Sequence, residues 1–421
     1  MYECIFLPSS LQQQALKDIE SLKAITEPDK PFTRRAFTEK YQEGRAYLIA
    51  QLKQLGLKPF IDNAGNLRAR LQGETETTIY IGSHSDTVPN GGILDGILGV
   101  IAGLTILRYF VEKKITPNCS IELIDFLAEE TSDWGISCIG SRGLSGQLSA
   151  EHLALKHPKT GEILADAIQR VGGDPDQLLK TPSANLDNYF LELHIEQGPV
   201  LEKTHKKIGL VTHIVGIERL KIQFKGISNH AGTTPMNMRQ DTLVAAAKTI
   251  VAIHEITNQL SIEASMQEES FVATCGMIEN HPNAMNVVPG STTLMVDTRS
   301  TKPQFFTHFK TQLQAYLEQL HFPYHWEITT DTSPVLMDTS LLALSETIAQ
   351  SANIPYLKMA SGAGHDAAFM ASIAKTAMLF IPSIAGISHN PKEASHEKDI
   401  LCGIELLLQL TIKLALNEKK L

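Results

Sequence analysis

The chain has 421 residues, of which 43% are hydrophobic and 20% charged, and this ordinary globular usage excludes disordered and fibrous architectures. At about 150 residues per domain, the length predicts roughly two to three domains. The formal net charge of −9 argues against a nucleic-acid partner, because the chain lacks the basic surface that a phosphate backbone requires.

The five cysteines are widely separated and show no paired spacing, which argues against a disulfide framework and against a thiolate zinc site. They favour a reducing compartment. The first ten residues lack the basic start and apolar run of a secretory signal, and no apolar stretch reaches the roughly 18 residues that span a bilayer. We therefore expect a cytoplasmic protein without a membrane partner.

In chain order, the first half alternates between helix-like and strand-like segments. Helices are predicted near Ala46–Leu55 and at the apolar stretch Gly96–Phe110. Strands are predicted at Thr78–Gly82, Ser120–Ala128 and Tyr189–Ile195. This alternation is typical of an α/β fold in which helices flank a mainly parallel sheet.

The rhythm changes near residue 215. The next segments are predicted in the order strand, helix, two strands, helix, strand, at Glu218–Lys225, Asp241–Gln259, Phe271–Ile278, Ser291–Asp297, Pro303–Leu320 and His325–Thr329. This order indicates a small α+β domain with an antiparallel sheet and two helices, after which the first rhythm resumes. We therefore expect a catalytic domain of residues 1–214 and 332–421, interrupted by an inserted domain of residues 215–331.

Polar side chains follow the predicted strands of the catalytic domain. The strand near residue 80 runs into His84 and, further on, Asp95. Later strands run into the pair Glu129 and Glu130, into His194, and towards His389. Because the carboxyl ends of parallel strands lie along one edge of a sheet, where ligands bind, we expect these groups to meet in one crevice.

Each of these residues also has a simpler interpretation. A single histidine after a strand is more often a hydrogen-bonded loop residue than a metal ligand. Adjacent glutamates usually lie in a solvated turn, and Asp95-Gly96 is a common turn signal. The coincidence at four separate strand ends favours a functional site, because loop chemistry alone does not predict it.

Imidazole and carboxylate groups together are typical of a divalent metal site. Three histidines and two carboxylates suit two metals that share one bridging carboxylate, and such a pair acidifies water and holds the oxygens of a tetrahedral intermediate. A free carboxylate nearby is then needed to move the proton from that water to a leaving nitrogen. The adjacent Glu129 and Glu130 can supply one ligand and one such base.

A series of motifs resembles the carbamoylase and amidohydrolase branch of the dinuclear M20 metallopeptidase superfamily, namely SHSDTVPNGG, LDGILGV, AEE, LELHIEQGP, HAGTTPM, NVVPG, DTR, SGAGHDA and GISHNPKE. That branch contains N-carbamoyl-L-amino acid hydrolases, allantoate and ureidoglycolate amidohydrolases and some β-ureidopropionases. The resemblance runs from about Asp62 to His389, in the family's order.

The resemblance implies two divalent metal ions per subunit, with Zn, Mn, Co and Ni as the candidates. Its motifs assign one metal to His84, Asp95 and His194, and the other to Asp95, Glu130 and His389. Asp86 would accept a hydrogen bond from His84 and fix its tautomer, while Glu129 would act as general base and acid. His194 points to the carbamoylase branch, since peptidase-like branches usually carry an acidic residue at this position.

The inserted domain carries motifs that the resemblance assigns to the substrate and to dimerisation. His230 resembles the residue that reaches across a homodimer and stabilises the oxyanion. Asn286 resembles the side chain that hydrogen-bonds the ureido group, and Arg299 resembles the clamp on the substrate carboxylate. Two simpler alternatives stay open, namely that His230 is a surface histidine near a Gly-Thr turn and that Arg299 is a surface charge at a strand end.

Further substrate contacts are implied in the catalytic domain. The backbone N–H groups of Gly362 and Ala363 would bind the same carboxylate, and Gln197 would also contact the substrate. His365 and Asp366 are predicted to be structural, because the implied metal shell is already filled without them.

The chain departs from the family in its acidic motif. The family commonly has two glutamates followed by Gly-Ser-Arg-Phe, whereas here they are followed by Thr131-Ser132-Asp133-Trp134. An acid thus replaces an arginine near the implied base. We expect the negative charge of Asp133 to raise the pKa of Glu129 and to alter the substrate pocket.

These implied roles predict a metal-dependent amidohydrolase that cleaves a linear C–N bond of a ureido group. An N-carbamoyl-L-amino acid is the favoured substrate, giving an amino acid, carbon dioxide and ammonia. Allantoate or ureidoglycolate hydrolysis is the first alternative and β-ureidopropionase the next, because these substrates present similar groups. An aminoacylase or dipeptidase and a metal-free binding protein are remote alternatives. The inserted domain is expected to act as a lid and to form a homodimer.

Overall fold

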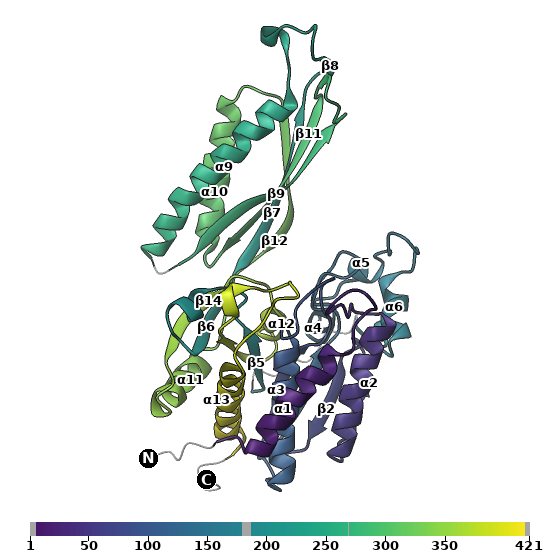
Figure 1. The fold of residues 1–421 in the computed structure, drawn as a ribbon, viewed down its shortest axis with the longest axis vertical. Coiled ribbons are helices and arrows are strands. Elements are labelled where there is room, and N and C mark those ends of the chain that lie inside the picture. Colours follow the sequence, from purple (N-terminus) through teal and green to yellow (C-terminus); the bar gives the residue numbers. More distant parts are fainter. Residues whose placement is uncertain (1–5, 179–186, 268, 417–421) are drawn as a thin grey trace. The chain divides into compact units, whose positions relative to one another are not determined.

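A computed structural model of the chain describes residues 6–178, 187–267 and 269–416 (Figure 1). The chain forms two compact units. The first comprises Met1–Thr212, Met337–Met359 and His365–Leu421, and the second comprises His213–Leu336 and Ala360–Gly364. None of the described helices combines the length and hydropathy needed to cross a membrane.

The first unit is built on a sheet whose central strands are parallel. In order across the sheet these are β4 (Ser120–Phe126), β3 (Thr78–His84), β5 (Tyr189–Ile195) and β15 (Lys375–Ile381). Almost every position of these strands is buried, as expected where helices cover both faces of a parallel sheet. The predicted α/β fold with a mainly parallel sheet is confirmed.

Further strands, most of them antiparallel to their neighbours, extend this sheet on both sides. β2 (Leu67–Leu71) and β1 (Phe60–Ile61) follow β4. On the other side, β6 (Ile208–Ile214) pairs with β15 and in turn with β13 (Val335–Leu336) and β14 (Tyr356–Ser361). The parallel strands therefore occupy the centre of a mixed sheet.

The long helices of the first unit are α1 (Ser9–Lys23), α2 (Glu39–Gln54), α3 (Ile97–Glu112), α11 (Thr339–Ser351) and α13 (Glu397–Ala415). The short helices are α4 (Ile139–Leu144), α5 (Ala150–Leu153), α6 (Leu164–Arg170), α7 (Pro175–Leu178), α8 (Val200–Lys203), α12 (Asp366–Met370) and the 3-10 helix η2 (Ile384–Gly386). The apolar α3 packs on β3, β4 and β5. It begins after Gly96, where a Cβ atom would lie 2.4 Å from Nε2 of His84, so only glycine fits between the helix and that ring.

The second unit consists of a four-stranded antiparallel sheet and two helices. Its strands lie in the order β12 (Tyr324–Thr332), β7 (Gly216–Lys225), β11 (Ser291–Ser300) and β9 (Phe271–His281). The helices α9 (Thr242–Ser265) and α10 (Pro303–Gln319) pack on each other and on β11. Along β11, buried residues alternate with partly exposed ones, so one face of the sheet meets the helices. The predicted antiparallel α+β arrangement is confirmed.

A separate two-stranded ribbon belongs to the second unit. It joins β8 (Asn229–His230) to β10 (Val287–Val288), with His230 opposite Val287. The 3-10 helix η1 (Met236–Met238) follows β8. The ribbon places two motifs that are more than 50 residues apart in the sequence directly beside each other.

Candidate active site

The histidines and carboxylates that follow the parallel strands converge in the first unit. His84 ends β3, His194 lies near the end of β5, and the turn after β4 carries Glu130. Asp95 lies between β3 and α3, and His389 follows η2. These five residues form two groups with potential ligand atoms within 4.8 Å of one another, namely His84, Asp95 and His194, and Asp95, Glu130 and His389.

Asp95 belongs to both groups, and its two carboxylate oxygens face different histidines. Oδ1 lies 3.0 Å from Nε2 of His194 and 3.8 Å from Nε2 of His84. Oδ2 lies 3.0 Å from Nε2 of His389, which in turn lies 3.2 Å from Oε1 of Glu130. This is the arrangement that a bridging carboxylate between two cations requires.

The backbone determines the tautomers of the two buried histidines. Nδ1 of His84 lies 3.0 Å from the carbonyl oxygen of Asp86, and Nδ1 of His194 lies 2.9 Å from that of Ile195. A carbonyl oxygen only accepts, so both Nδ1 atoms carry a hydrogen and Nε2 of each ring is the nitrogen that faces the site. The N–H of Gly96 also lies 3.2 Å from Nε2 of His194, on the side of the ring that faces the site.

The carboxylate of Asp86 has a different principal contact from the one expected. Oδ1 of Asp86 lies 3.5 Å from Nδ1 of His84. The Asp86 carboxylate accepts the backbone N–H groups of Glu129 at 3.2 Å and Glu130 at 3.3 Å. Its side chain therefore holds the turn that presents the two glutamates, while its carbonyl group orients His84.

Burial and neighbouring charged side chains shift the pKa values of the residues in this cluster. Burial alone would raise the pKa of Asp95, but hydrogen bonds from His194 and His389 hold it well below its ordinary value. Hydrogen bonds to Asp95 and Glu130 raise the pKa of His389 to about 10. The carboxylates that stabilise a protonated His389 would stabilise a metal cation in the same place, so the donor set fits divalent metals.

Glu129 lies beside the two groups but belongs to neither. It is 9% exposed, and its Oε2 lies 3.6 Å from Nε2 of His84. Burial raises the pKa of Glu129 well above its ordinary value, and the charge of His84 only partly opposes this. A buried carboxylate with a raised pKa next to a metal site is suited to accept and return a proton.

A third group of possible ligands lies behind the first, formed by Glu192, His194 and His365. Both carboxylate oxygens of Glu192 are already used, since one accepts the hydroxyl of Ser83 at 2.7 Å and the other the N–H of Ala367 at 3.1 Å. The buried His365 packs edge-on against His194, with ring centroids 4.6 Å apart. This layer supports His194.

In the second unit, the β8–β10 ribbon brings His230 and Asn286 together. The N–H of Ala231 donates to the carbonyl oxygen of Asn286 at 2.9 Å. Nδ1 of His230 accepts the N–H groups of Gly232 at 3.0 Å and Thr233 at 3.2 Å. Nε2 of the exposed, neutral imidazole therefore carries the hydrogen and is a donor to any group that meets it.

Arg299 is held in a defined orientation in the second unit. Its Nε donates to Oδ1 of Asp297 at 2.9 Å, and its Nη1 donates to the carbonyl oxygen of Gly362 at 2.7 Å. The N–H of Ala363 donates to Oγ of Ser361 at 3.2 Å. The guanidinium thus lies beside the glycine-rich segment that was implied to bind the same carboxylate.

Known proteins are similar to this chain over nearly its whole length. The sequence model of Peptidase family M20/M25/M40 matches residues 80–413. The chain is 33% identical over 395 residues to allantoate amidohydrolase of Escherichia coli K12, covering 92% of this chain and 94% of that protein. It is 31% identical over 399 residues to N-carbamoyl-L-amino acid amidohydrolase of Geobacillus stearothermophilus, covering 93% and 95%.

This chain belongs to the M20 family. A solved structure of a hydantoinase/carbamoylase family amidase from Burkholderia multivorans has the same fold, with a TM-score of 0.84, 28% identity and coverage of 96% of this chain and 98% of that one. The resemblance inferred from the motifs is confirmed.

Two residues of the site in this M20 protein were not assigned from the sequence. Glu393 accepts the N–H groups of Leu94 and Asp95, and Ser388 lies between Glu393 and Asp95. Both belong to the motif GISHNPKE, in which only His389 was assigned. Gln197, implied to bind substrate, donates from Nε2 to Oδ2 of Asp95 at 2.9 Å.

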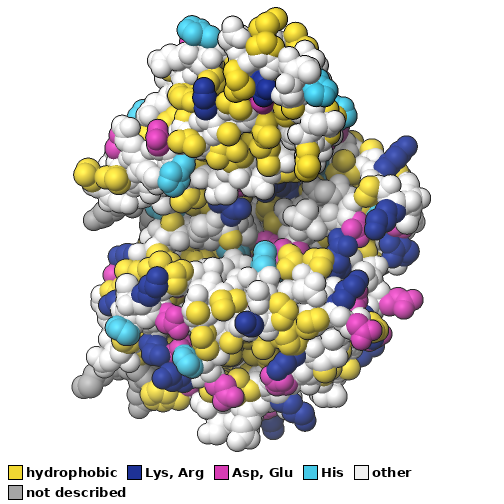
Figure 2. Space-filling view, turned by 45° about the horizontal axis from the view of Figure 1, so that its top comes forward, with side chains coloured by type: hydrophobic (Ala, Val, Ile, Leu, Met, Phe, Trp, Pro, Cys, Tyr) yellow, Lys and Arg dark blue, Asp and Glu magenta, His cyan; other side chains and the backbone are white. Residues whose placement is uncertain are grey.

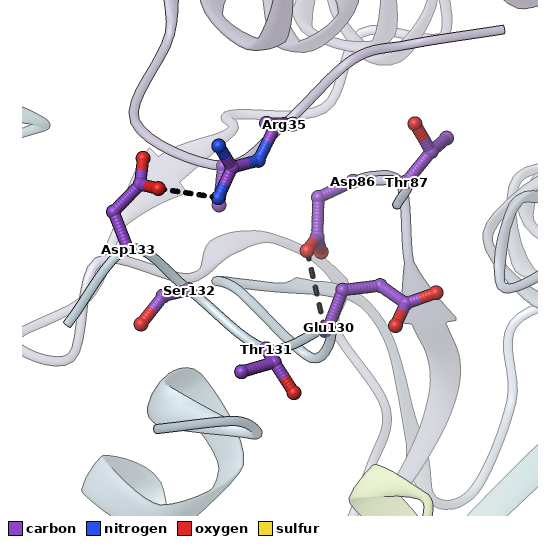
Figure 3. A pocket seen from close by; sticks show the side chains of 8 residues that line it. Arg35, Asp86, Thr87, Glu130, Thr131, Ser132 and Asp133 are labelled. Carbon is purple, nitrogen blue, oxygen red and sulfur yellow. Dashed lines mark hydrogen bonds and ion pairs between the residues drawn. The ribbon is translucent and has the colours of Figure 1, made fainter. Parts of the chain in front are cut away.

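The departure from the family motif has a different consequence from the one expected. Oδ1 of Asp133 accepts from Nη2 of Arg35 at 2.6 Å, and Figure 3 shows this pair at one side of a pocket that Asp86 and Glu130 also line. Asp133 is not among the groups that raise the pKa of Glu129, which are burial and nearer carboxylates. Because Arg35 pairs with its carboxylate, we expect Asp133 to have little effect on this pKa.

Proposed function

We propose that this protein is a metal-dependent amidohydrolase that cleaves the linear C–N bond of a ureido substrate. The observation that carries the proposal is the pair of ligand groups sharing Asp95, with the buried, unshared carboxylate of Glu129 beside them. The two relatives named above are amidohydrolases of ureido compounds, which supports the same class of reaction.

In the proposed site, His84, Asp95 and His194 hold one divalent ion, and Asp95, Glu130 and His389 hold the other, with Zn, Mn, Co and Ni as candidates. The bound pair supplies acidification of water and polarisation of the carbonyl group. Glu129 accepts the proton from the attacking water and delivers it to the leaving nitrogen, and the raised pKa of Glu129 suits both steps.

The second unit is proposed to provide the substrate contacts. His230 of the partner subunit donates its Nε2–H to the developing oxyanion, and its backbone-fixed neutral tautomer makes this possible. Asn286 binds the ureido group. Arg299 forms a bidentate pair with the substrate carboxylate, assisted by the segment at Gly362 and Ala363. Gln197, which donates a hydrogen bond to Asp95, also contacts the substrate.

The surface of the second unit supports the proposed homodimer. Large hydrophobic side chains are exposed along α9 and β9, at Leu243, Val244, Val251, Ile262, Val272, Met277 and Ile278. Hydrophobic side chains gather on this unit in the upper part of Figure 2. β9 is also the edge strand of its sheet, with unpaired backbone groups on one side. Apolar patches of this kind are typical of protein interfaces.

We favour an N-carbamoyl-L-amino acid as substrate, with allantoate or ureidoglycolate as the alternative and a β-ureido acid after it. All of these carry a carboxylate for Arg299 and a ureido group for Asn286. Cleavage of the favoured substrate gives the amino acid, carbon dioxide and ammonia.

A substrate panel tests the proposal. Purified protein is first stripped of metal and reloaded with Zn²⁺, Mn²⁺, Co²⁺ or Ni²⁺. Ammonia release is then measured with N-carbamoyl-L-amino acids, allantoate, ureidoglycolate and β-ureidopropionate. N-acyl amino acids and dipeptides serve as controls. We expect metal-dependent ammonia release from the ureido compounds and none from the metal-free protein. Hydrolysis confined to the acyl compounds or dipeptides would assign the site to an aminoacylase or dipeptidase. Absence of both metal binding and turnover would indicate a binding protein.

A further inference from the structure

Glu393 holds the loop that carries Asp95. Its carboxylate is buried at 3% exposure, and its Oε1 accepts the N–H groups of Leu94 at 2.9 Å and Asp95 at 3.0 Å. Both N–H groups precede the first turn of α3, so the helix offers them no acceptor, and both residues are buried. Because a buried backbone N–H requires a partner, the conformation of the loop at Asp95 depends on this side chain.

The second oxygen of Glu393 contacts the segment that carries His389. Ser388, which directly precedes His389, donates its hydroxyl to Oε2 of Glu393 at 2.8 Å. The same Oγ accepts from Nε2 of Gln197 at 3.3 Å and lies 3.3 Å from Oδ2 of Asp95. One carboxylate therefore connects two chain segments that lie almost 300 residues apart and that each supply a proposed ligand.

The loop packs directly against this carboxylate. A Cβ atom at Gly92 would lie 1.9 Å from both Cδ and Oε1 of Glu393, so any larger residue would displace one of them. The close approach leaves Glu393 little freedom to move relative to the loop.

The two ligand groups depend on this connection to different degrees. His84 and His194 are both 1% exposed and are oriented by strand ends and by backbone carbonyl groups. The His389 side chain is 49% exposed, and its residue lies in a loop with a left-handed backbone, at φ 52°. The surrounding fold therefore holds His389 less firmly than it holds His84 and His194.

We propose that Glu393 is a positioning residue that fixes Asp95 relative to His389 and thereby determines the affinity of the site formed by Asp95, Glu130 and His389 for a divalent cation. This inference rests on the metal pair of the proposed function, but it is independent of the substrate. Glu393 acts through Asp95 and Ser388 and does not itself contact a cation.

Titration of the metal-free full-length protein with Co²⁺ tests the inference, with the bound cation counted by elemental analysis and each site followed by absorption. We expect Glu393→Ala to retain one site at wild-type affinity and to weaken the other by about 10- to 100-fold. Glu393→Gln should stay within about threefold of wild type, because an amide oxygen can still accept both N–H groups. Glu405→Ala is the matched control, since Glu405 is a partly buried carboxylate that accepts the N–H of Leu7 in another part of the first unit.

A folded Glu393→Ala protein that binds two cations with wild-type affinities would overturn the inference. If circular dichroism shows that Glu393→Ala does not fold, Ser388→Ala decides, because it removes only the hydroxyl of a partly exposed residue. Weaker binding at one site of Ser388→Ala supports the inference, and unchanged binding at both overturns it. A wild-type protein that binds a single cation would overturn the proposed metal pair itself, and this result is distinguishable from a failure of Glu393 alone.

Discussion

The proposed metal ligands and the proposed substrate contacts are stabilised in different ways. In the first unit, His84, Asp95 and His194 are at most 4% exposed, and each is hydrogen-bonded or paired within the unit. In the second unit, His230 and Asn286 are exposed, and their partners are neighbours in the β8–β10 ribbon.

This difference bears on the proposal that His230 acts in a partner subunit. Buried polar groups must find partners inside the protein, so the first set is organised by the fold itself. The exposed set is oriented by its backbone, and within the described part of its own unit the Nε2–H of His230 meets no acceptor, so it is open to a group from outside that unit. Substitutions in the first set should therefore act within their own subunit, whereas those at His230 should depend on the partner.

The largest effect is expected for Glu129→Gln. The amide has the same shape but cannot accept the proton, so kcat should fall by about 10³-fold or more. Both cations should stay bound, because Glu129 belongs to neither ligand group. Ammonia release and metal analysis on the same sample check this, with the exposed Glu151→Gln as control. Near-normal turnover would remove Glu129 from its role, and loss of a cation would make it a ligand instead.

His230→Ala should reduce kcat by about 10²- to 10³-fold through loss of an oxyanion donor, with metal content unchanged. The cross-subunit role makes a sharper prediction. In a dimer of one Glu129→Gln chain and one His230→Ala chain, one of the two sites has both an intact Glu129 and an intact His230 from the other chain.

Co-expression of the two inactive variants with different tags tests whether His230 acts in the site of the other chain. Random pairing should restore about a quarter of wild-type activity, because half of the dimers are mixed and each has one working site. If His230 acts within its own chain, the mixed dimers stay inactive. Light scattering on the same sample establishes the assembly state.

Arg299→Lys should lower kcat/KM by about 10- to 100-fold, mainly through KM, because an ammonium group cannot form the bidentate pair. With an N-carbamoyl amine that lacks the carboxylate, wild type and Arg299→Lys should be equally active. Arg219→Lys is the control, since Arg219 contacts the same Asp297 at 3.0 Å from the other side of that carboxylate. A similar loss with both substrates would assign Arg299 to maintaining the unit rather than to the substrate.

The regular elements could be predicted from the sequence where an apolar run has clear ends. The strand predicted at Tyr189–Ile195 has the same bounds as β5, because aromatic and branched apolar residues recur along it and polar residues follow it directly, although Glu192 and His194 lie within it. α9 extends to Ser265, six residues beyond the predicted Gln259, and its last turns still bury Leu260 and Ala264 at helical spacing, so the prediction ended the helix too early. The antiparallel β2 beside the central sheet was not predicted, although its sequence Leu-Arg-Ala-Arg-Leu alternates between apolar and charged residues.

The site could be predicted as far as its residues follow strands or match motifs. The contacts of Glu393 with the Asp95 loop could not, because they join segments almost 300 residues apart and leave no local pattern. The pairing of Arg35 with Asp133 across 98 positions was also outside what a motif comparison shows. Charge at a motif position can therefore be predicted from sequence, whereas its compensation by a distant residue requires the fold.

That compensation leads to the smallest expected effect. Asp133→Asn should leave the acid limb of the kcat/KM–pH profile unchanged, because Arg35 already neutralises Asp133 and the pKa of Glu129 is set by burial, His84 and nearer carboxylates. Asp366→Asn is the comparison, since the buried Asp366 does raise this pKa. Its removal should lower the pKa of Glu129, and the acid limb should move to lower pH, because the base then stays deprotonated further into acid. A shift of similar size in Asp133→Asn would show that Arg35 does not shield the base from this acid.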